Sequence, residues 1–162
     1  MVSVDMEYRG AVPWEDMKDS IHLAYLAGFF DGDGSIVATI EPNKECRFGY
    51  RTRVIVKCAQ HKSHREICDE MRSTFICGSV SKSQKDVVEF SAKRAEDVKR
   101  ILVQLLPYLR LKQKQAKLAL ELLALYGKKN ENTFRQAVQL VKQVQALNYS
   151  GRSRRSAYPR ND

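Results

Sequence analysis

The chain has 162 residues, of which 43% are hydrophobic, so it is long and apolar enough to form a single domain around one core. Its formal net charge of +9 at pH 7 favours a polyanionic partner, most commonly nucleic acid, although a ribosomal or membrane-surface protein would have a similar total. No stretch approaches the roughly 20 apolar residues that span a bilayer, and residues 1–7 lack the pattern of a secretory signal. We therefore expect an intracellular protein with no membrane partner.

The cysteines are few and widely spaced, at Cys46, Cys58, Cys68 and Cys77. This spacing fits neither a disulfide framework nor a zinc site made of cysteine pairs. We expect them to be reduced and mostly buried, as small apolar residues.

The first predicted element is a helix over residues 19–33, where apolar residues recur at helical spacing. Asp19 or Ser20 is placed to cap its start, and Gly34 is expected to end it. Residues 1–18 show no sustained period and are interpreted as an N-terminal arm whose Trp14 packs on the domain.

Two hairpins and further helices are predicted after this helix. Residues 35–43 and 51–59 alternate between apolar and polar, so they are expected to pair as antiparallel strands with one core face and one face rich in cations and amides. A helix over 62–75, a second hairpin over 79–83 and 87–91, and helices over 95–106, 112–126 and 132–148 follow. This order predicts an α+β domain over residues 19–148, with an antiparallel four-stranded sheet that has helices on one face only.

The last segment, residues 149–162, is predicted to be a flexible basic tail that binds phosphates. Its phosphate-binding candidates are Arg152, Arg154 and Arg155. A tail that only improves solubility is the alternative interpretation.

Within the first predicted helix, small residues recur every four positions, at Ala24, Gly28 and Gly32. Such a stripe lets two helices approach closely, but close packing of the helix on its own sheet would explain it equally well. Asp31 and Asp33 lie at the C-terminal end of the helix, where free carbonyls and the helix dipole favour a cation. Oxygen donors there suit Mg²⁺, although a solvated helix cap is the more common reason for two aspartates.

The nine residues 26–34, with the sequence LAGFFDGDG, resemble the LAGLIDADG signature of homing endonucleases at nearly every position. Tyr25, Ser35 and Ile36 beside the string, and residues 109–116 further on, are also similar to the single-motif branch of that family. The resemblance covers about residues 20–155. It implies the LAGLIDADG fold, which is α-β-β-α-β-β-α with extra C-terminal helices and a saddle-shaped sheet.

A single motif implies a homodimer, because in the family two motif helices pack together. The matching interface is Ala24, Gly28 and Gly32, related by a closed two-fold axis. By the same match, Asp33 is the metal ligand and Gly32 adds its backbone carbonyl. Asp31 is expected to cap or support the site.

Further catalytic residues are also implied by the family pattern. Gln60 matches a glutamine that orders water, and Lys112 matches a lysine that supports charge in the transition state. The family has a basic residue four positions after the glutamine, where this chain has His64 followed by Arg65. The sequence leaves open which of these two acts.

The implied activity is that of a site-specific homing endonuclease, a metal-dependent enzyme that hydrolyses both strands of double-stranded DNA with a staggered cut. The expected site is a long pseudo-palindrome of about two helical turns. The expected cofactor is Mg²⁺, and Mn²⁺ or Ca²⁺ is expected to substitute for it in binding.

In the family, the polar face of the sheet lies along the major groove of the DNA. The matching residues here are Ser35, Val37, Thr39, Glu41, Asn43, Arg51, Arg53, Ile55, Lys57, Ser81, Ser83 and Lys85. Arg51 and Arg53 have the geometry to contact guanine, Asn43 to contact adenine, and Glu41 to accept a hydrogen bond from cytosine.

Two alternatives stay open at the level of sequence. One is a maturase that binds intron RNA and assists splicing, and the other is a non-catalytic DNA-binding regulator on the same scaffold. Asp33, Gln60 and Lys112 favour cleavage, and the segment after Asn148 is too short for the added domain that a regulator would have. The usual setting of the family implies a chloroplast, a mitochondrion or a prokaryotic cytoplasm.

Overall fold

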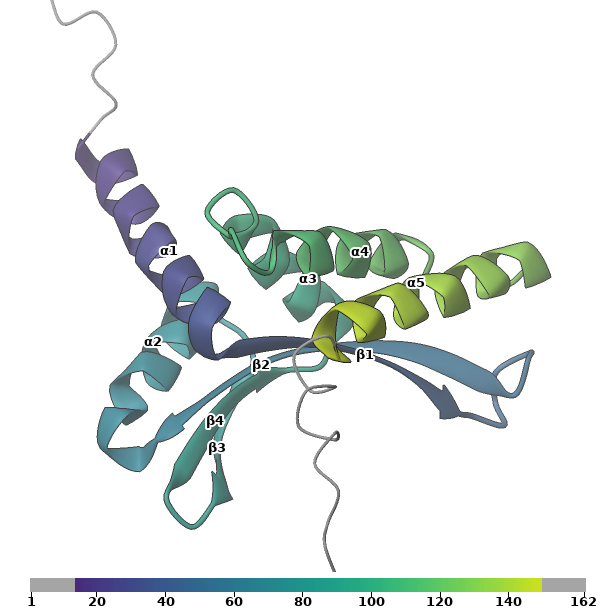
Figure 1. The fold of residues 1–162 in the computed structure, drawn as a ribbon, viewed down its shortest axis with the longest axis horizontal. Coiled ribbons are helices and arrows are strands. Elements are labelled where there is room, and N and C mark those ends of the chain that lie inside the picture. Colours follow the sequence, from purple (N-terminus) through teal and green to yellow (C-terminus); the bar gives the residue numbers. More distant parts are fainter. Residues whose placement is uncertain (1–13, 150–162) are drawn as a thin grey trace, which may run out of the picture.

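The computed structural model describes residues 14–149, which fold into helices and an antiparallel sheet in the predicted order (Figure 1). The elements are α1 (Trp14–Asp33), β1 (Gly34–Pro42), β2 (Tyr50–His61), a 3-10 turn (Lys62–His64), α2 (Arg65–Phe75), β3 (Ser79–Gln84), β4 (Val87–Ala92), α3 (Ala95–Leu105), α4 (Gln113–Ala124) and α5 (Glu131–Tyr149). The α+β fold is therefore confirmed. Helix α1 begins at Trp14, so residues 14–18, which were predicted to belong to an irregular arm, are helical.

The predicted basic tail, with Arg152, Arg154 and Arg155, lies outside the described residues, and so do residues 1–13 and the side chain of Trp14. No helix among residues 14–149 is long and apolar enough to cross a membrane.

The sheet has the strand order β1-β2-β4-β3, and each neighbouring pair is antiparallel. In β1 and β2, residues pair from Gly34 opposite Cys58 to Pro42 opposite Tyr50. Figure 1 shows the sheet as a curved layer with α3, α4 and α5 on one side. The opposite side is called the open face below.

Alternation along the strands separates the core from the open face. Ile36 and Ala38 of β1 and Val54 and Val56 of β2 are buried on the helix side, as is Phe90 of β4. They pack with apolar residues of α1, α2, α3, α4 and α5 in one hydrophobic core. Full burial of each large apolar side chain contributes about 1.5–3 kcal/mol, so this core fixes which face of the sheet remains open.

Helix α5 protects the free edge of β1. Gln145 Nε2 donates to the carbonyl of Ala38 at 3.0 Å, and Asn148 Nδ2 donates to the carbonyl of Ile36 at 2.7 Å. Side-chain amides thus satisfy carbonyls of an edge strand that would otherwise be free to pair with another chain. They also hold β1 in register beside the end of α1.

Helix α1 ends at Asp33, directly before Gly34, as expected from the sequence. Gly34 is the first residue of β1, and it is not among the described glycines with a positive φ. A Cβ at this position would lie 2.2 Å from Cδ2 of Phe30. Gly34 is needed because the buried Phe30 ring lies directly against the backbone where the helix turns into the strand.

The second hairpin contains an irregularity that changes which side chains face outward. Lys82 pairs with Val88 and Gln84 with Val87, so Ser83 is an extra residue in β3. A bulge of this kind reverses the alternation, and the register places Gln84 rather than Ser83 on the open face. Ser81 keeps its predicted place opposite Glu89.

The cysteines are free thiols, as expected. Cys58 and Cys68 are buried, whereas Cys46 and Cys77 are only half-buried. Burial raises the pKa of the Cys68 thiol, so this cysteine stays protonated and behaves as a small apolar residue of the core.

Candidate active site and DNA-binding face

Asp31 joins the end of α1 to the start of α4. Its Oδ2 accepts the backbone N–H groups of Arg110 and Leu111 at 2.7 and 3.2 Å, and its Oδ1 accepts that of Lys112 at 2.9 Å. These donors lie just before α4, where N–H groups have no partner within the helix. Asp31 is therefore a capping residue supplied by a helix about 80 positions earlier in the sequence, which agrees with its predicted supporting role.

Asp31 keeps its charge although it is buried. Burial acts to raise the pKa of its carboxyl, but the backbone donors of Arg110, Lys112 and Leu111 and the charge of Lys112 outweigh burial and lower it. A carboxylate that accepts several N–H bonds is stabilised in its ionised form. This negative charge also compensates the dipole at the start of α4.

Asp33, two residues later, is exposed at the end of α1. The side-chain amide of Gln60, near the end of β2, donates to its Oδ2 at 2.5 Å. The structure thus brings together two residues that the sequence assigned to one site, although they are 27 positions apart. The other carboxylate oxygen and the last carbonyls of α1 remain as oxygen donors.

Lys112 reaches the same place from the start of α4. Its Nζ donates to the backbone carbonyl of Asp31. Burial lowers the pKa of this lysine below its ordinary value, and the carboxylates of Asp31 and Asp33 oppose the effect only in part. Lys112 therefore presents a partly desolvated ammonium group beside Asp33, at the negative end of the α1 dipole.

The two candidates for the basic position differ in their surroundings. Arg65 is turned along α2, where its Nε donates to Asp69 Oδ2 at 2.9 Å and its Nη2 to Oδ1 at 3.5 Å. His64 lines a depression beside α1 together with Gln60 and Tyr25. The structure brings His64 to Gln60 and pairs Arg65 with a residue of its own helix.

The end of α1 offers oxygen donors that suit a metal ion. Among residues 14–149, no group of three or more His, Cys, Asp or Glu side chains lies close enough to hold a metal ion. Asp33 and the carbonyl of Gly32 nevertheless form an all-oxygen donor set at an exposed helix end, and this is the ligand chemistry that Mg²⁺ prefers. The donors present therefore fit a hard divalent ion.

Helix α1 also carries an apolar stripe that the described part of the chain leaves exposed. Ile21 is 62% exposed and Tyr25 59% exposed. A Cβ added at Gly28 or Gly32 would meet no atom of residues 14–149 within 4 Å. Packing of α1 on its own sheet, the alternative raised by the sequence, does not explain these two glycines.

The register places most of the predicted DNA-binding residues on the open face. Ser35 pairs with Lys57, Val37 with Ile55, Thr39 with Arg53, and Glu41 with Arg51, and all of these lie between the buried positions of β1 and β2. Ser81 belongs to the same face, and Lys85 is exposed in the turn after β3.

Sequence reasoning missed Glu89 of β4 as a residue of the open face. Glu89 pairs with Ala59 of β2 and lies 3.5 Å from Lys57 Nζ. The alternation of residues 87–91 contains this information, because Val88 and Phe90 are apolar around Glu89. Only the strand order places β4 beside β2, and the strand order is not readable from the pattern of a single strand.

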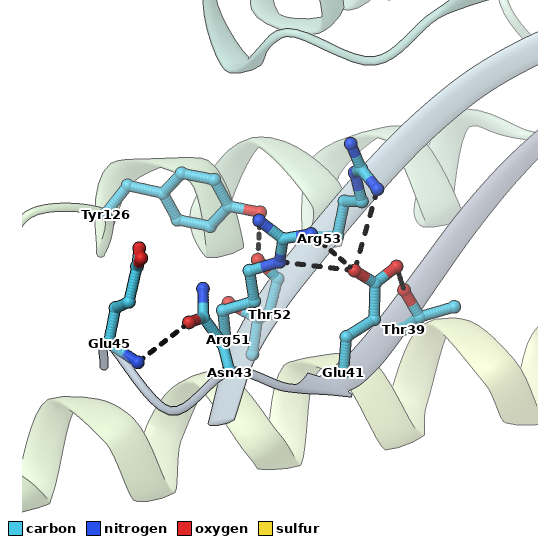
Figure 2. Close-up of polar contacts among 8 residues, drawn as sticks. All are labelled: Thr39, Glu41, Asn43, Glu45, Arg51, Thr52, Arg53 and Tyr126. Carbon is cyan, nitrogen blue, oxygen red and sulfur yellow. Dashed lines mark hydrogen bonds and ion pairs between the residues drawn. The ribbon is translucent and has the colours of Figure 1, made fainter. Parts of the chain in front are cut away.

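Side-chain contacts already occupy part of this face (Figure 2). Glu41 contacts both Arg51 and Arg53. Asn43 has a different role, because its Oδ1 accepts the backbone N–H of Glu45 at 3.0 Å within the β1–β2 loop. A two-point contact to adenine needs that same amide oxygen, so Asn43 would have to release the loop to make the contact.

The model of the LAGLIDADG endonuclease family matches residues 26–124, which is more than half of the chain. The chain belongs to this family. It is 34% identical over 130 residues to the DNA endonuclease I-CreI of Chlamydomonas reinhardtii, with 79% of each chain covered. It is 33% identical over 108 residues to the DNA endonuclease I-CvuI of Chlorella vulgaris, with 67% of each covered.

Solved structures agree with this assignment. I-CvuI in complex with the I-CreI target in the presence of Mg matches with a TM-score of 0.76 and 31% identity, covering 81% of this chain and 84% of that chain. The archaeal intron-encoded endonuclease I-Vdi141I, complexed with DNA, matches with a TM-score of 0.72 at 16% identity, covering 91% of each, and supports the fold alone.

This LAGLIDADG protein is therefore a site-specific homing endonuclease, a metal-dependent enzyme that hydrolyses DNA. I-CvuI has also been solved with its target in the presence of Ca, so divalent ions accompany DNA complexes of that relative. Neither the family model nor these relatives support the RNA-binding alternative.

Proposed function

We propose that this endonuclease acts as a homodimer that makes a staggered double-strand cut at the centre of a long pseudo-palindromic DNA site. The observation that carries the proposal is the end of α1, where the exposed Asp33 lies beside Gln60 and Lys112, next to a helix stripe that has no partner among residues 14–149. One copy supplies half of a centre, and a second copy, related to the first by a two-fold axis beside α1, would supply the other half.

The glycines of α1 support the dimer. Gly28 and Gly32 are open to solvent in one copy, and glycine in a helix interior costs roughly 0.5–1 kcal/mol relative to alanine. Close approach of a second α1 explains why two glycines are placed there despite that cost. Ala24 extends the same stripe toward Ile21 and Tyr25, whose exposed apolar surfaces a partner helix would cover.

In the proposed centre, Asp33 of each copy would bind a divalent ion, and this ion is expected to be Mg²⁺. The Gly32 carbonyl would be a further ligand. The chemistry that such an ion supplies is Lewis-acid activation of water and of the scissile phosphate. Asp31 does not bind the ion, because both of its carboxylate oxygens are used by the start of α4. The two aspartates of the motif therefore have different roles.

Three other side chains act around Asp33. Gln60 holds the Asp33 carboxylate in place through its amide and orders the attacking water. The Lys112 ammonium stabilises the negative charge that develops on the phosphate, and its partial burial strengthens this effect. His64 takes the basic position, because it lies beside Gln60 while Arg65 is paired with Asp69.

The open face of the sheet lies along the major groove in this proposal. Arg51 and Arg53 are the residues best suited to read guanine, and Lys57 lies nearer the catalytic centre on β2. Arg152, Arg154 and Arg155 would bind phosphates without reading sequence. The compartment proposed is the one that holds the target genome, an organelle or a prokaryotic cytoplasm.

Cleavage by variants tests this function directly. A binding selection in Ca²⁺ from palindromic duplexes with about 10 randomised base pairs per half-site yields a substrate, since each saddle covers about one helical turn. The selected duplex is then incubated with wild-type protein in Mg²⁺ or EDTA, and with Asp33→Asn in Mg²⁺. We expect staggered cutting only by the wild type in Mg²⁺, with binding retained by Asp33→Asn.

Asp19→Asn is a matched control, because it makes the same chemical change on an exposed residue of the same helix. Cutting should be unchanged in this control. Cutting by Asp33→Asn at the wild-type rate, or in EDTA, would show that the nuclease centre lies elsewhere. Tight binding by the wild type without cutting in any divalent ion would instead favour the regulator alternative.

A further inference from the structure

Glu41 is an acidic residue in the middle of a surface that is proposed to face DNA. It lies on the open face of β1, opposite Arg51 of β2 in the strand register, and Arg53 is the next residue of β2 on the same face. A carboxylate at such a place is repelled by the DNA backbone unless cations neutralise it. The contacts of Glu41 therefore decide what it does.

Four contacts hold the Glu41 carboxylate (Figure 2). Arg51 donates to its Oε2 from Nε at 3.2 Å and from Nη2 at 3.0 Å. Nη1 of Arg53 lies 3.5 Å from the same oxygen, and Oγ1 of Thr39 donates to Oε1 at 3.3 Å. Both carboxylate oxygens thus have partners within the chain, and the two arginines share Oε2.

The carboxylate is held in its ionised form. The hydrogen bond from Arg51 lowers the pKa of Glu41 most, burial opposes it, and the charges of Arg53 and Arg51 and the hydrogen bond from Thr39 lower it further. Glu41 is therefore a permanent negative charge between two positive ones at neutral pH. The three residues have a combined charge of +1.

Each arginine keeps enough donors to read a base while it is held. A guanidinium has five N–H donors, and a two-point contact to guanine O6 and N7 uses two of them. Arg51 keeps its Nη1 group, and Arg53 keeps Nε and Nη2. The backbone between them is fixed from the other side of the sheet, where Tyr126 donates its hydroxyl to the Thr52 carbonyl at 3.0 Å.

Stability of the fold does not explain the cluster. Arg51 is about half exposed and Glu41 about one-third exposed, and ion pairs between exposed groups contribute little to folding. The contacts can instead favour DNA binding, because an arginine that is already ordered loses less conformational entropy when it binds. The contacts also restrict which base atoms the guanidinium can reach.

We propose that Glu41 is a specificity-determining positioning residue, which orients Arg51 and Arg53 toward guanines on neighbouring base pairs and does not itself read a base. This inference rests on the proposed function, because it assumes that the open face binds DNA. It replaces the expectation that Glu41 accepts a hydrogen bond from cytosine.

The binding selection described above tests the role of Glu41, with the randomised duplexes as the probe and Ca²⁺ as the ion. The variants are Glu41→Ala, Glu41→Gln, Arg51→Ala and Arg53→Ala. The matched control is Glu45→Ala, which raises the net charge by the same amount, while no hydrogen bond or ion pair joins the side chain of Glu45 to either arginine in Figure 2.

We expect Arg51→Ala and Arg53→Ala to mark the guanine positions that each arginine reads. Glu41→Ala should lose preference at both sets of positions, by about 5-fold to 150-fold each, while its affinity for random DNA rises as much as that of Glu45→Ala. Glu41→Gln keeps the shape and one acceptor, so it should retain an intermediate preference. Glu45→Ala should select the same sequences as the wild type.

Other outcomes would overturn the positioning role. If Glu41→Ala loses preference only at a cytosine that the arginine variants still select, Glu41 is a direct reader. If it selects the wild-type sequence with full preference, the cluster has no role in specificity. If the wild type enriches no sequence at all, the proposed function fails first, and the inference about Glu41 fails with it.

Discussion

The β1–β2 ribbon has two functional ends that are built in different ways. At the end beside α1, Asp33 is joined to Gln60 across 27 positions, and Asp31 is joined to residues 110–112 across about 80. At the far end, Glu41 and Arg51 are only 10 positions apart and belong to one hairpin. Long-range contacts and buried groups fix the first end, whereas local contacts between exposed side chains arrange the second.

This difference indicates how the enzyme separates chemistry from recognition. The catalytic end depends on the hydrogen bonds that join Asp31 of α1 to residues 110–112 just before α4, so its geometry is coupled to folding. The reading end lies outside the core, and surface substitutions there have little effect on stability. Variants at the catalytic end should therefore lower the rate of cleavage, and variants at the reading end should change the base preference. A variant that changes both properties would contradict this expectation.

The largest effect should come from Lys112→Met at the catalytic end. Loss of a preorganised, partly buried donor to the developing charge typically lowers the rate by about 10²–10³-fold. Binding of the selected duplex should change much less. Single-turnover cleavage in Mg²⁺ measures the rate, and Lys114→Met is the control because Lys114 is an exposed residue of the same helix.

If Lys112→Met cuts DNA as fast as the control Lys114→Met, Lys112 has no role in the chemical step and is a structural residue. In that case its contact with the Asp31 carbonyl would be the reason for its position. If Lys112→Met both cuts slowly and binds the duplex weakly, the proposed separation of catalysis and DNA recognition between the two ends would be contradicted.

Asp31→Asn should affect folding before it affects chemistry. The change removes a charged acceptor from three backbone N–H groups, so we expect a loss of about 1–3 kcal/mol in the free energy of unfolding. Asp33→Asn, two residues away, should change stability much less because Asp33 is exposed. Urea denaturation measures both, and equal losses would contradict the division of roles between the two aspartates.

The same pair predicts a dependence on pH. The pKa of Asp31 is lowered by folding, so its contribution is complete above its ordinary value of 3.8 and is lost as the pH falls through the folded value. The stability difference between wild type and Asp31→Asn should therefore shrink below pH 3.8. A difference that stays constant to low pH would show that the Asp31 charge contributes nothing.

At the reading end, Arg53→Ala should leave stability and the rate of cutting nearly intact while it relaxes specificity. The expected loss is about 1–3 kcal/mol of discrimination at one symmetric pair of positions. Competition between duplexes that differ at that pair measures it. Equal weakening for all sequences would identify Arg53 as a phosphate contact instead.

The smallest effect is expected from Arg155→Ala in the basic tail. One lost phosphate contact should reduce the slope of log affinity against log salt by about 1, with the same change for every sequence. Titrations at several salt concentrations measure this slope. A change in base preference would contradict the tail's assignment to the backbone of the DNA.

Much of this molecule was readable from its sequence because its elements are strongly periodic. The alternation of residues 35–43 and 51–59 predicts both strands and the face that each presents, since one face must be buried. The nine-residue motif locates Asp33 at a helix end, and family resemblance links it to Gln60 and Lys112.

Other features depend on contacts that no local pattern contains. The need for Gly34 arises from the Phe30 ring, whose position is set by packing of the whole core. The bulge at Ser83 is a property of the pairing between β3 and β4. The partners of Asp31 and Glu41 likewise appear only when separate segments are brought together.

In the proposed dimer, two copies of the chain share one cutting centre, and each contributes Asp33. To test for this shared centre, wild-type and Asp33→Asn protein are mixed in known ratios, the subunits are allowed to exchange, and double-strand cleavage of the selected duplex is measured. Dimers with two intact copies decline as the square of the wild-type fraction, and cutting should follow that square. Cutting that falls in direct proportion to the wild-type fraction would mean that each copy carries a complete site, and the two-copy centre would be wrong.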